Sequence, residues 1–368
     1  MNTSTIKNDE RIIFELRSIY NRFGYSRYRM SKFEEYEFYL HNKDFLISDS
    51  VITFTDTNGR LMALKPDVTL SIVKNSRDIP GYVQRLYYAE NVYRVSKGAN
   101  CFRELMQVGL ECIGDIDDYC VMEVVQLAAE CLRSISENSV LNISSLDVIS
   151  ELLEGVSEED RKAVFACIGE KNVHELKRLC RAMGMDAARM ALLEKLILSF
   201  GTPAQVLPGL VAQLGQTPAL DRLMSILQDF EGSDLEDMLR IDFSVMGNEN
   251  YYNGIVFRGF IDGVPSAVLS GGQYDRLMRK LGRKSGAIGF AVYLDSLERL
   301  FEPESGYDAD ILLLYDEDAD LKGLRQAVAR LNAQGKCVAA MHGVSDKIRC
   351  KQTARYRNGE VEIIEDHA

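Results

Sequence analysis

Two stretches of the sequence carry side chains whose types and spacing could bind a small charged molecule. The first is residues 246–258, MGNENYYNGIVFR, where Tyr251 and Tyr252 stand between turn-forming Asn and Gly residues and lead into the β-rich run IVF. Tyrosines in such a place supply aromatic surface together with a hydroxyl group. The pattern predicts the lip of a ligand pocket that feeds into a strand.

The second stretch is Phe102–Gly114, FRELMQVGLECIG. In a strand, Arg103, Gln107 and Glu111 share one face, because side chains alternate between the two faces. That face lines up a cation, an amide and a carboxylate, and Gly109 leaves a gap between the amide and the carboxylate, which are roughly 13 Å apart. A small zwitterion such as an amino acid would fit this gap.

Two alternatives to this interpretation stay open. The three polar residues could face solvent on a half-exposed sheet, and a helix would also align Arg103, Gln107 and Glu111 because they are four residues apart. Gly109 and the Val, Cys and Ile content favour the strand.

The remaining candidate residues give weaker signals. Gly271 and Gly272, in the run SGGQYDRL, permit close approach of the backbone to a ligand, but a tight structural turn explains the pair equally well. His174 is a lone histidine for which a structural or solvated role is expected. No catalytic constellation accompanies it.

The elements around these residues predict an α+β fold. Apolar residues at helical spacing indicate a helix that ends at Gly24, and two long runs separated by a polar loop indicate antiparallel strands. An Asn58-Gly59 turn joins two shorter runs in hairpin style. The expected helices are Asp9–Phe23, Val68–Asn75 and Tyr119–Ser134, and the expected strands are Phe33–Leu40, Val51–Thr55, Leu61–Leu64, Arg85–Arg94, Phe102–Gly114, Val140–Ile143 and Leu239–Phe243.

Changes in composition and in hydrophobic periodicity divide the chain into three parts. Residues 145–239 are nearly continuous helix, interrupted at Thr202-Pro203 and Thr217-Pro218, and are expected to be an insertion in a ligand-binding domain formed by residues 1–144 and 240–303. A Pro- and Gly-containing break precedes a small α/β unit, residues 306–368. In that unit the expected strands are Ala309–Tyr315, Cys337–Met341 and Val361–Ile364, and the expected helices are Leu321–Leu331 and Ser345–Tyr356.

Composition limits the classes of function. The chain has 368 residues, a net charge of −12 and a pI near 5.0, so nucleic acid is not an expected partner, although a local basic patch would fit these totals. The eight cysteines show no C-x₂-C pair and no zinc spacing, which is typical of buried, reduced thiols in the cytoplasm. No apolar run approaches the roughly 18 residues that span a bilayer. We expect no membrane insertion, no metal and no cofactor.

The order of the motifs resembles the histidyl-tRNA synthetase-like branch of the class II aminoacyl-tRNA synthetases. TNGRLMALKPDVT is similar to that family's strand ending in R-P-E/D-x-T, with Lys65 in place of the usual arginine. RLYYAENVYR with FRELMQVGLECIG is similar to motif 2, NENYYNGIVF to the histidine-specific R-G-x-D-Y-Y-T segment, and SGGQYDRL with AIGFAVYLDSL to the G-G-R-Y-D and motif 3 region. The resemblance covers residues 10–300 and implies an antiparallel sheet flanked by helices.

Matching positions in that family imply a pocket for L-histidine. By this resemblance, Asp67 and Glu111 hold an ammonium or imidazole group and Arg94 pairs with a carboxylate. Neighbouring residues of a strand point in opposite directions, so if this segment is extended, one tyrosine at most is expected to reach the ligand, and Tyr252 is preferred. The predicted ligand-binding residues are Asp67, Thr69, Arg94, Arg103, Gln107, Glu111, Tyr251, Tyr252, Gly271 and Gly272.

Several positions depart from the synthetase pattern. Gly247 stands where the synthetases place an arginine that compensates charge during adenylate formation, and Ser296 stands where motif 3 has the arginine that grips the ATP phosphates. Asn250 replaces an Asp, and Ser96 replaces the motif 2 glutamate. Losing one preorganised cation can cost roughly 100-fold or more in rate, which argues against activation chemistry. Arg299 is three residues beyond Ser296 and need not point into the same site.

Among non-catalytic relatives, the chain resembles the regulatory subunits of ATP phosphoribosyltransferase in length, helical insertion and short C-terminal unit. This resemblance implies a non-enzymatic subunit that supports the short catalytic subunit in the first step of histidine biosynthesis, senses L-histidine for feedback inhibition and self-associates through its synthetase-like domain. Two rival classes stay open: a divergent histidine-activating enzyme that forms an aminoacyl adenylate, and an RNA-binding paralogue of the synthetases.

Overall fold

The computed structural model describes residues 8–46, 51–95, 101–247, 251–300, 307–343 and 347–367. The chain divides into two compact units, Asp9–Glu298 and a unit that contains Arg299–Ala368. Within the described ranges, no helix is both long and apolar enough to cross a membrane. All eight cysteines are free, but Cys101 and Cys337 are exposed, so the expectation of buried thiols is wrong for these two.

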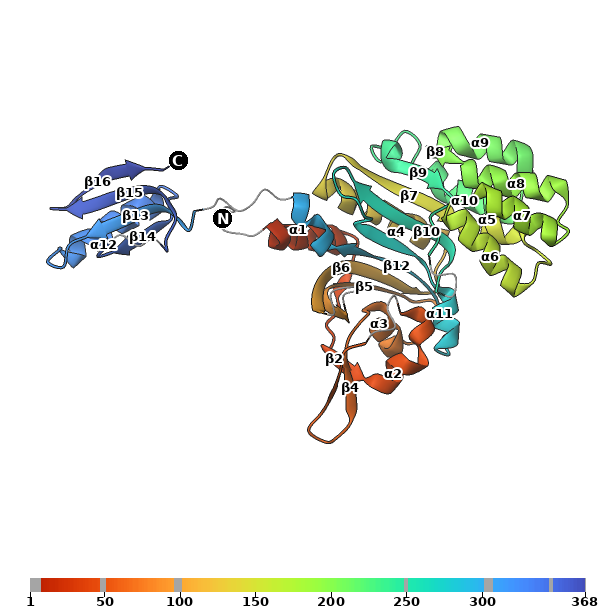
Figure 1. Ribbon diagram of the computed structural model, residues 1–368, viewed down its shortest axis with the longest axis horizontal. Helices are drawn as coiled ribbons and strands as arrows, with labels where there is room; N and C mark the ends of the chain where they lie inside the picture. The colour runs from red at the N-terminus through yellow and green to blue at the C-terminus, as the bar shows by residue number, and fades with distance from the viewer. Residues whose placement is uncertain are drawn as a thin grey trace. The chain divides into compact units, whose positions relative to one another are not determined.

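A nine-stranded sheet is the centre of the larger unit (Figure 1), in the order β1-β5-β6-β12-β11-β10-β7-β9-β8. The expected antiparallel pair is confirmed, because β5 and β6 pair along their whole length, from Val83 opposite Gly114 to Val95 opposite Phe102. The β1–β5 and β7–β9 pairs are parallel. The strands are β1 Ser26–Arg27, β5 Val83–Val95, β6 Phe102–Gly114, β7 Ser139–Ser145, β8 Phe200–Gly201, β9 Leu239–Asp242, β10 Asn253–Ile261, β11 Leu269–Gln273 and β12 Gly286–Tyr293.

Helices α1 (Asn8–Arg22) and α4 (Asp118–Ile135) cover one face of this sheet. Their apolar positions recur at helical spacing, so each helix presents one continuous stripe to the strands. The Tyr20 ring of α1 lies 6.1 Å from the Phe290 ring of β12, and the Asp117 side chain caps α4 by accepting from the Cys120 amide. The opposite face of β6, β12, β11 and β10 therefore remains for other contacts.

A three-stranded sheet in the order β2-β4-β3 stands beside the large one. The predicted hairpin is confirmed, but the strand expected over Phe33–Leu40 ends at Glu35, where a short helix begins, because Tyr39 buries its ring in the core from that helix. The elements are β2 Phe33–Glu35, α2 Tyr36–His41, η2 Lys43–Phe45, β3 Thr53–Thr55, β4 Leu61–Leu64 and α3 Thr69–Asn75.

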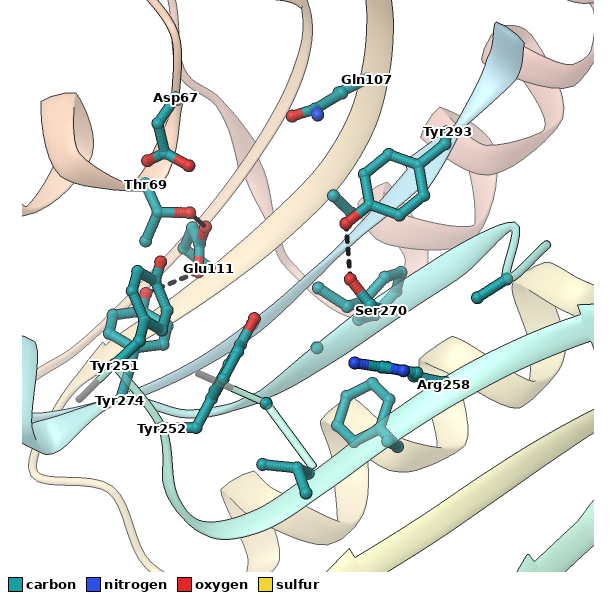
Figure 2. A pocket seen from close by; sticks show the side chains of 18 of the residues that line it. Asp67, Thr69, Gln107, Glu111, Tyr251, Tyr252, Arg258, Ser270, Tyr274 and Tyr293 are labelled. Carbon is teal, nitrogen blue, oxygen red and sulfur yellow. Dashed lines mark hydrogen bonds between the residues drawn. The ribbon is translucent and has the colours of Figure 1, made fainter. Parts of the chain in front are cut away.

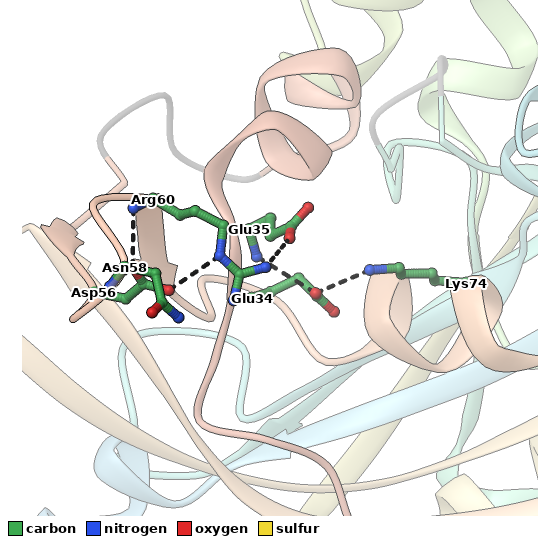
Figure 3. A network of polar contacts seen from close by, with 6 residues as sticks. All are labelled: Glu34, Glu35, Asp56, Asn58, Arg60 and Lys74. Carbon is green, nitrogen blue, oxygen red and sulfur yellow. Dashed lines mark hydrogen bonds and ion pairs between the residues drawn. The ribbon is translucent and has the colours of Figure 1, made fainter.

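Charged side chains connect the hairpin to its neighbours (Figure 3). Arg60 pairs with Asp56 across the turn and with Glu35 of β2, at 3.1 Å in both cases, and Lys74 of α3 pairs with Glu34 at 2.9 Å. Exposed ion pairs of this kind contribute little to stability, typically about 0–1 kcal/mol each. Their effect is to fix how β2, the turn and α3 lie relative to one another.

The helical block predicted for residues 145–239 is confirmed as a run of helices. The predicted interruptions at Thr202-Pro203 and Thr217-Pro218 are confirmed, because one helix ends before each site and each threonine is the N-cap of a new helix with proline at the first helical position. The predicted domain boundaries stay a prediction. The helices are α5 Leu146–Leu152, α6 Glu158–Gly169, α7 Val173–Ala182, α8 Ala187–Leu198, α9 Pro203–Leu214 and α10 Pro218–Gln228, followed by η3 Glu236–Met238, and after β11 come α11 Asp275–Lys280 and η4 Leu294–Leu300.

The smaller unit contains a four-stranded sheet in the order β14-β13-β15-β16. The helix expected over Ser345–Tyr356 is wrong. From Cys350 the chain is a strand that pairs in parallel with β13, and it buries Ala354 and Tyr356 against α12. The polar residues that suggested a helix, Lys351, Gln352, Arg355 and Arg357, are less buried than these two. The elements are β13 Ala309–Tyr315, α12 Leu321–Ala333, β14 Val338–Met341, β15 Cys350–Arg357 and β16 Glu360–Asp366.

Packing of α4 on the sheet predicts a large effect of truncating Leu132. This side chain is fully buried, and its Cδ1 lies 2.6 Å from the place that a Cβ on Gly259 of β10 would take. Leu132→Ala should lower the free energy of unfolding by about 2–5 kcal/mol, measured by urea denaturation. Leu198→Ala is the matched control, because Leu198 is 64% exposed at the end of α8. Equal effects of the two substitutions would contradict the packing described.

Candidate functional site

A pocket of about 490 Å³ opens on the sheet face that carries Glu111. Cross-strand register explains why it is hollow. Gly289 of β12 lies opposite Glu111 of β6, and Ala291 lies opposite both Gly109 of β6 and Ser270 of β11. The positions between the outer walls are thus glycine, alanine and serine, whose side chains are too small to fill the space above the strands.

The Glu111 carboxylate lies at one end of the pocket (Figure 2). Its two oxygens accept hydrogen bonds from Thr69 Oγ1 at 2.6 Å and from Tyr274 Oη at 2.5 Å. A Cβ on Gly289 would lie 1.9 Å from Glu111 Oε2, so only glycine leaves room for the carboxyl group. The pKa of Glu111 is raised to about 8, mainly by burial and also by the nearby Asp67, while the two hydroxyl donors oppose the rise.

A second carboxylate, Asp67, lies at the same end. Its Oδ1 accepts from the Leu70 amide at 2.8 Å, and burial raises the pKa of Asp67 while the amide and Arg94 oppose the rise. Arg94 Nε donates weakly to the Pro66 carbonyl at 3.4 Å. Arg94 Nη2 is buried and has no hydrogen-bond acceptor among the described residues. Two carboxyl groups and an incompletely paired guanidinium thus line the same pocket.

Aromatic rings form the wall of the pocket beside the carboxylates. The Tyr251 and Tyr252 ring centroids are 4.6 Å apart, and Tyr274 lies 5.6 Å from Tyr251. Burial raises the pKa of each of these phenols well above its ordinary value. Both Tyr251 and Tyr252 line the pocket, because β10 begins at Asn253 and the two residues before it are not extended strand. Which of the two tyrosines reaches a ligand stays a prediction.

Most of the predicted residues line this pocket, and their contact with a ligand stays a prediction. Arg103 does not line it: β6 runs past the pocket, and Arg103 is exposed near the beginning of that strand, opposite Arg94. Gly272 is not part of the wall either, although a Cβ there would lie 3.0 Å from Tyr252 Cδ1. The predicted residues that do line the pocket are Asp67, Thr69, Arg94, Gln107, Glu111, Tyr251, Tyr252 and Gly271.

Sequence reasoning missed several residues of the wall, among them Tyr88, Arg258, Ser270 and Tyr293. Strand alternation places Arg258 on the same face as Val256, which also lines the pocket. This alternation could not identify Arg258 from the sequence alone, because the sequence does not say which face of β10 borders the pocket. Within the described ranges, no group of three or more His, Cys, Asp or Glu side chains could hold a metal ion.

The positions predicted to depart from the synthetase pattern have distinct structural settings. A Cβ on Gly247 would lie 2.1 Å from Tyr252 Cδ2, so position 247 accepts no side chain while Tyr252 keeps its place. Ser296 lies in η4 and is not part of the pocket wall. Asn250, Ser96 and the side chain of Arg299 lie outside the described residues.

Comparisons with known proteins agree with this fold. The family model for histidyl-tRNA synthetase matches residues 1–297. A solved structure from Bacillus halodurans, described as an ATP phosphoribosyltransferase regulatory subunit/histidyl-tRNA synthetase, superimposes with a TM-score of 0.75 at 24% identity and covers 92% of this chain and 90% of its own. The predicted α+β fold of the class II synthetase type is confirmed.

Two further matches concern ATP phosphoribosyltransferase. A protein of Oceanobacillus iheyensis named ATP phosphoribosyltransferase regulatory subunit is 25% identical over 348 residues, which are 91% of this chain and 85% of the relative. A chain of the HisG:HisZ complex from Thermotoga maritima superimposes with a TM-score of 0.60 at 20% identity, over 78% of this chain and 97% of its own. With a family model that matches most of its length, this chain belongs to the histidyl-tRNA synthetase family.

Proposed function

We propose that this protein is the regulatory subunit of ATP phosphoribosyltransferase, that it supports the catalytic subunit in the first step of histidine biosynthesis, and that its pocket senses L-histidine. The relatives named ATP phosphoribosyltransferase regulatory subunit support the first part. The observation that carries the second part is the pocket end where Asp67 and Glu111 are buried together. Two buried carboxyl groups are costly unless a cation joins them.

Histidine supplies the groups that this end lacks. Its ammonium or imidazole group can pair with Glu111 and Asp67, and the rings of Tyr251 and Tyr252 offer π surface to an imidazole. Arg94 Nη2, which has no acceptor among the described residues, can donate to a carboxylate that a second arginine of the pocket, Arg258, also reaches. A zwitterion would therefore satisfy groups of both signs that are buried together in the empty pocket.

The setting of Gly247 supports sensing rather than catalysis. Adenylate formation depends on preorganised cations at the transferring phosphates. Position 247 cannot carry one while Tyr252 lies against its backbone, and Ser296 is neutral. The rival function, a divergent histidine-activating enzyme, is favoured by the two guanidiniums that line the pocket, Arg94 and Arg258.

Regulation then follows from differential binding. A ligand shifts an equilibrium between two states only by the difference in its affinity for them, so histidine must prefer the less active state of the complex. We also propose that the subunit self-associates through its synthetase-like unit.

Calorimetry of histidine with the full chain tests the sensor. We expect binding to the wild type, alone or with its catalytic subunit, and a loss of about 10- to 100-fold in affinity in Glu111→Gln, because a charge-assisted hydrogen bond is replaced by a neutral one. Arg103→Gln, which changes an exposed residue outside the pocket, should bind like the wild type. No histidine binding in either preparation would refute the sensor.

Histidine binding should also release protons. At pH 7.5 the Glu111 carboxyl is mostly protonated in the empty pocket, since burial raises its pKa to about 8. A bound cation favours the carboxylate and lowers that pKa, so the proton leaves and affinity should rise with pH up to about 8. Calorimetry at pH 7.5 in two buffers of different ionisation enthalpy measures the release. The same buffer dependence in Glu111→Gln would contradict the assignment to Glu111.

The rival function has its own assay. The purified chain should show no histidine-dependent exchange of pyrophosphate into ATP, and it should form a stable complex with the catalytic transferase in size-exclusion chromatography. A genuine histidyl-tRNA synthetase assayed in parallel is the positive control. Exchange activity that disappears in Arg94→Gln would favour the activating enzyme over the regulatory subunit.

A further inference from the structure

A second polar cluster lies in the pocket on strands β10 to β12. Arg258 and Ser270 are cross-strand partners, so their side chains project from the same face of the sheet. The Ser270 hydroxyl lies 2.5 Å from the Tyr293 hydroxyl (Figure 2), and all three side chains line the pocket. We call Arg258, Ser270 and Tyr293 the hydroxyl–arginine cluster.

Arg258 is held in place but keeps most of its hydrogen-bonding capacity. Its Nη2 donates to the Met246 carbonyl at 2.7 Å, and no described carboxylate pairs with it. A guanidinium has five N–H donors in a fixed fork. The contact with Met246 therefore fixes the position of the fork and leaves donors for a ligand.

The paired hydroxyls also have a donor to spare. When two hydroxyl groups share one hydrogen bond, one of them donates and the other accepts, and the acceptor keeps its own hydrogen. Either Ser270 or Tyr293 thus has an O–H that can turn toward an anion beside Arg258.

Positive charge reaches this cluster from two sides. Burial raises the pKa of Tyr293, and the Ser270 hydrogen bond, Arg94 and Arg258 all oppose the rise. Both guanidiniums are therefore close enough to stabilise negative charge near the Tyr293 oxygen. Asp67, which lines the same pocket, acts in the opposite direction and raises the pKa of Tyr293.

The cluster lies across the pocket from Glu111. Strand β10 is three ladder spacings from β6 in the sheet order, or roughly 14 Å between the backbones. Long side chains project into that interval from both ends, an acid from β6 and a guanidinium from β10. The pocket is therefore bipolar across the strands, which suits a ligand with a cation at one end and an anion at the other.

We infer that the hydroxyl–arginine cluster is the carboxylate-binding part of the pocket and that Arg258 is the residue that makes the pocket specific for an intact α-amino acid. This inference rests on the proposed function. An arginine fork matches a carboxylate geometrically, and the free hydroxyl adds a third donor. Because Met246 precedes Gly247, the guanidinium held by its carbonyl also supplies a positive charge beside a position that cannot carry one.

Comparing histidine with histamine tests this assignment. Histamine keeps the imidazole and the amine of histidine and lacks the carboxylate. Calorimetry of both with the full-length wild type should show histidine at least 10-fold tighter. Arg258→Gln should weaken histidine binding about 10- to 100-fold and leave histamine binding nearly unchanged, so the ratio of the two affinities collapses.

Two variants make the result interpretable. Arg27→Gln removes an exposed arginine on β1, at the far edge of the same sheet, and should preserve both affinities. Ser270→Ala should weaken histidine and spare histamine, by a smaller factor than Arg258→Gln does. If Arg258→Gln and Ser270→Ala both keep the wild-type ratio, the inference is wrong while the sensor stands. If the wild type binds neither ligand, the proposed sensor and this inference both fail.

Discussion

The buried carboxyl group of Glu111 is the constraint on which the pocket depends. Away from water its oxygens need donors, and these come from Thr69 and Tyr274, which are 42 and 163 residues away in the sequence. Gly289 has to lack a side chain for the carboxyl group to fit at all. Four separate segments of the chain are thus positioned by one group, and a displacement of any donor would leave a buried oxygen unsatisfied.

Sequence patterns predicted part of this arrangement and missed part for identifiable reasons. Alternation along β6 placed Gln107 and Glu111 together, because strand periodicity is a local property. It also included Arg103, because periodicity does not say where a strand leaves a pocket. Arg258 was missed because its importance depends on which face of β10 is covered by α4, which is a matter of tertiary packing.

The rest of the fold shows the same division between local and non-local information. The hairpin around Asn58-Gly59 and the long β5–β6 pair follow from turn chemistry and alternation, and both were predictable. The strand Cys350–Arg357 was not, since its polar residues suit a helix equally well and only pairing with β13 decides between them. Whether Tyr251 and Tyr252 belong to an extended strand was undecided for a similar reason, because the start of β10 at Asn253 is not visible in the sequence.

Recognition and activation make different demands on the cations of such a pocket. A carboxylate is present in the ground state and can be bound by a guanidinium from any strand that reaches it, whereas phosphoryl chemistry needs charges placed where the transition state will form. Under the proposed function, Arg258 meets the first demand and nothing at position 247 meets the second. Because the Tyr252 ring lies against Gly247, an arginine there would also require the tyrosine to move. Under the proposed function, activation chemistry would thus need coupled changes, and each intermediate would disturb the pocket proposed to bind the ligand.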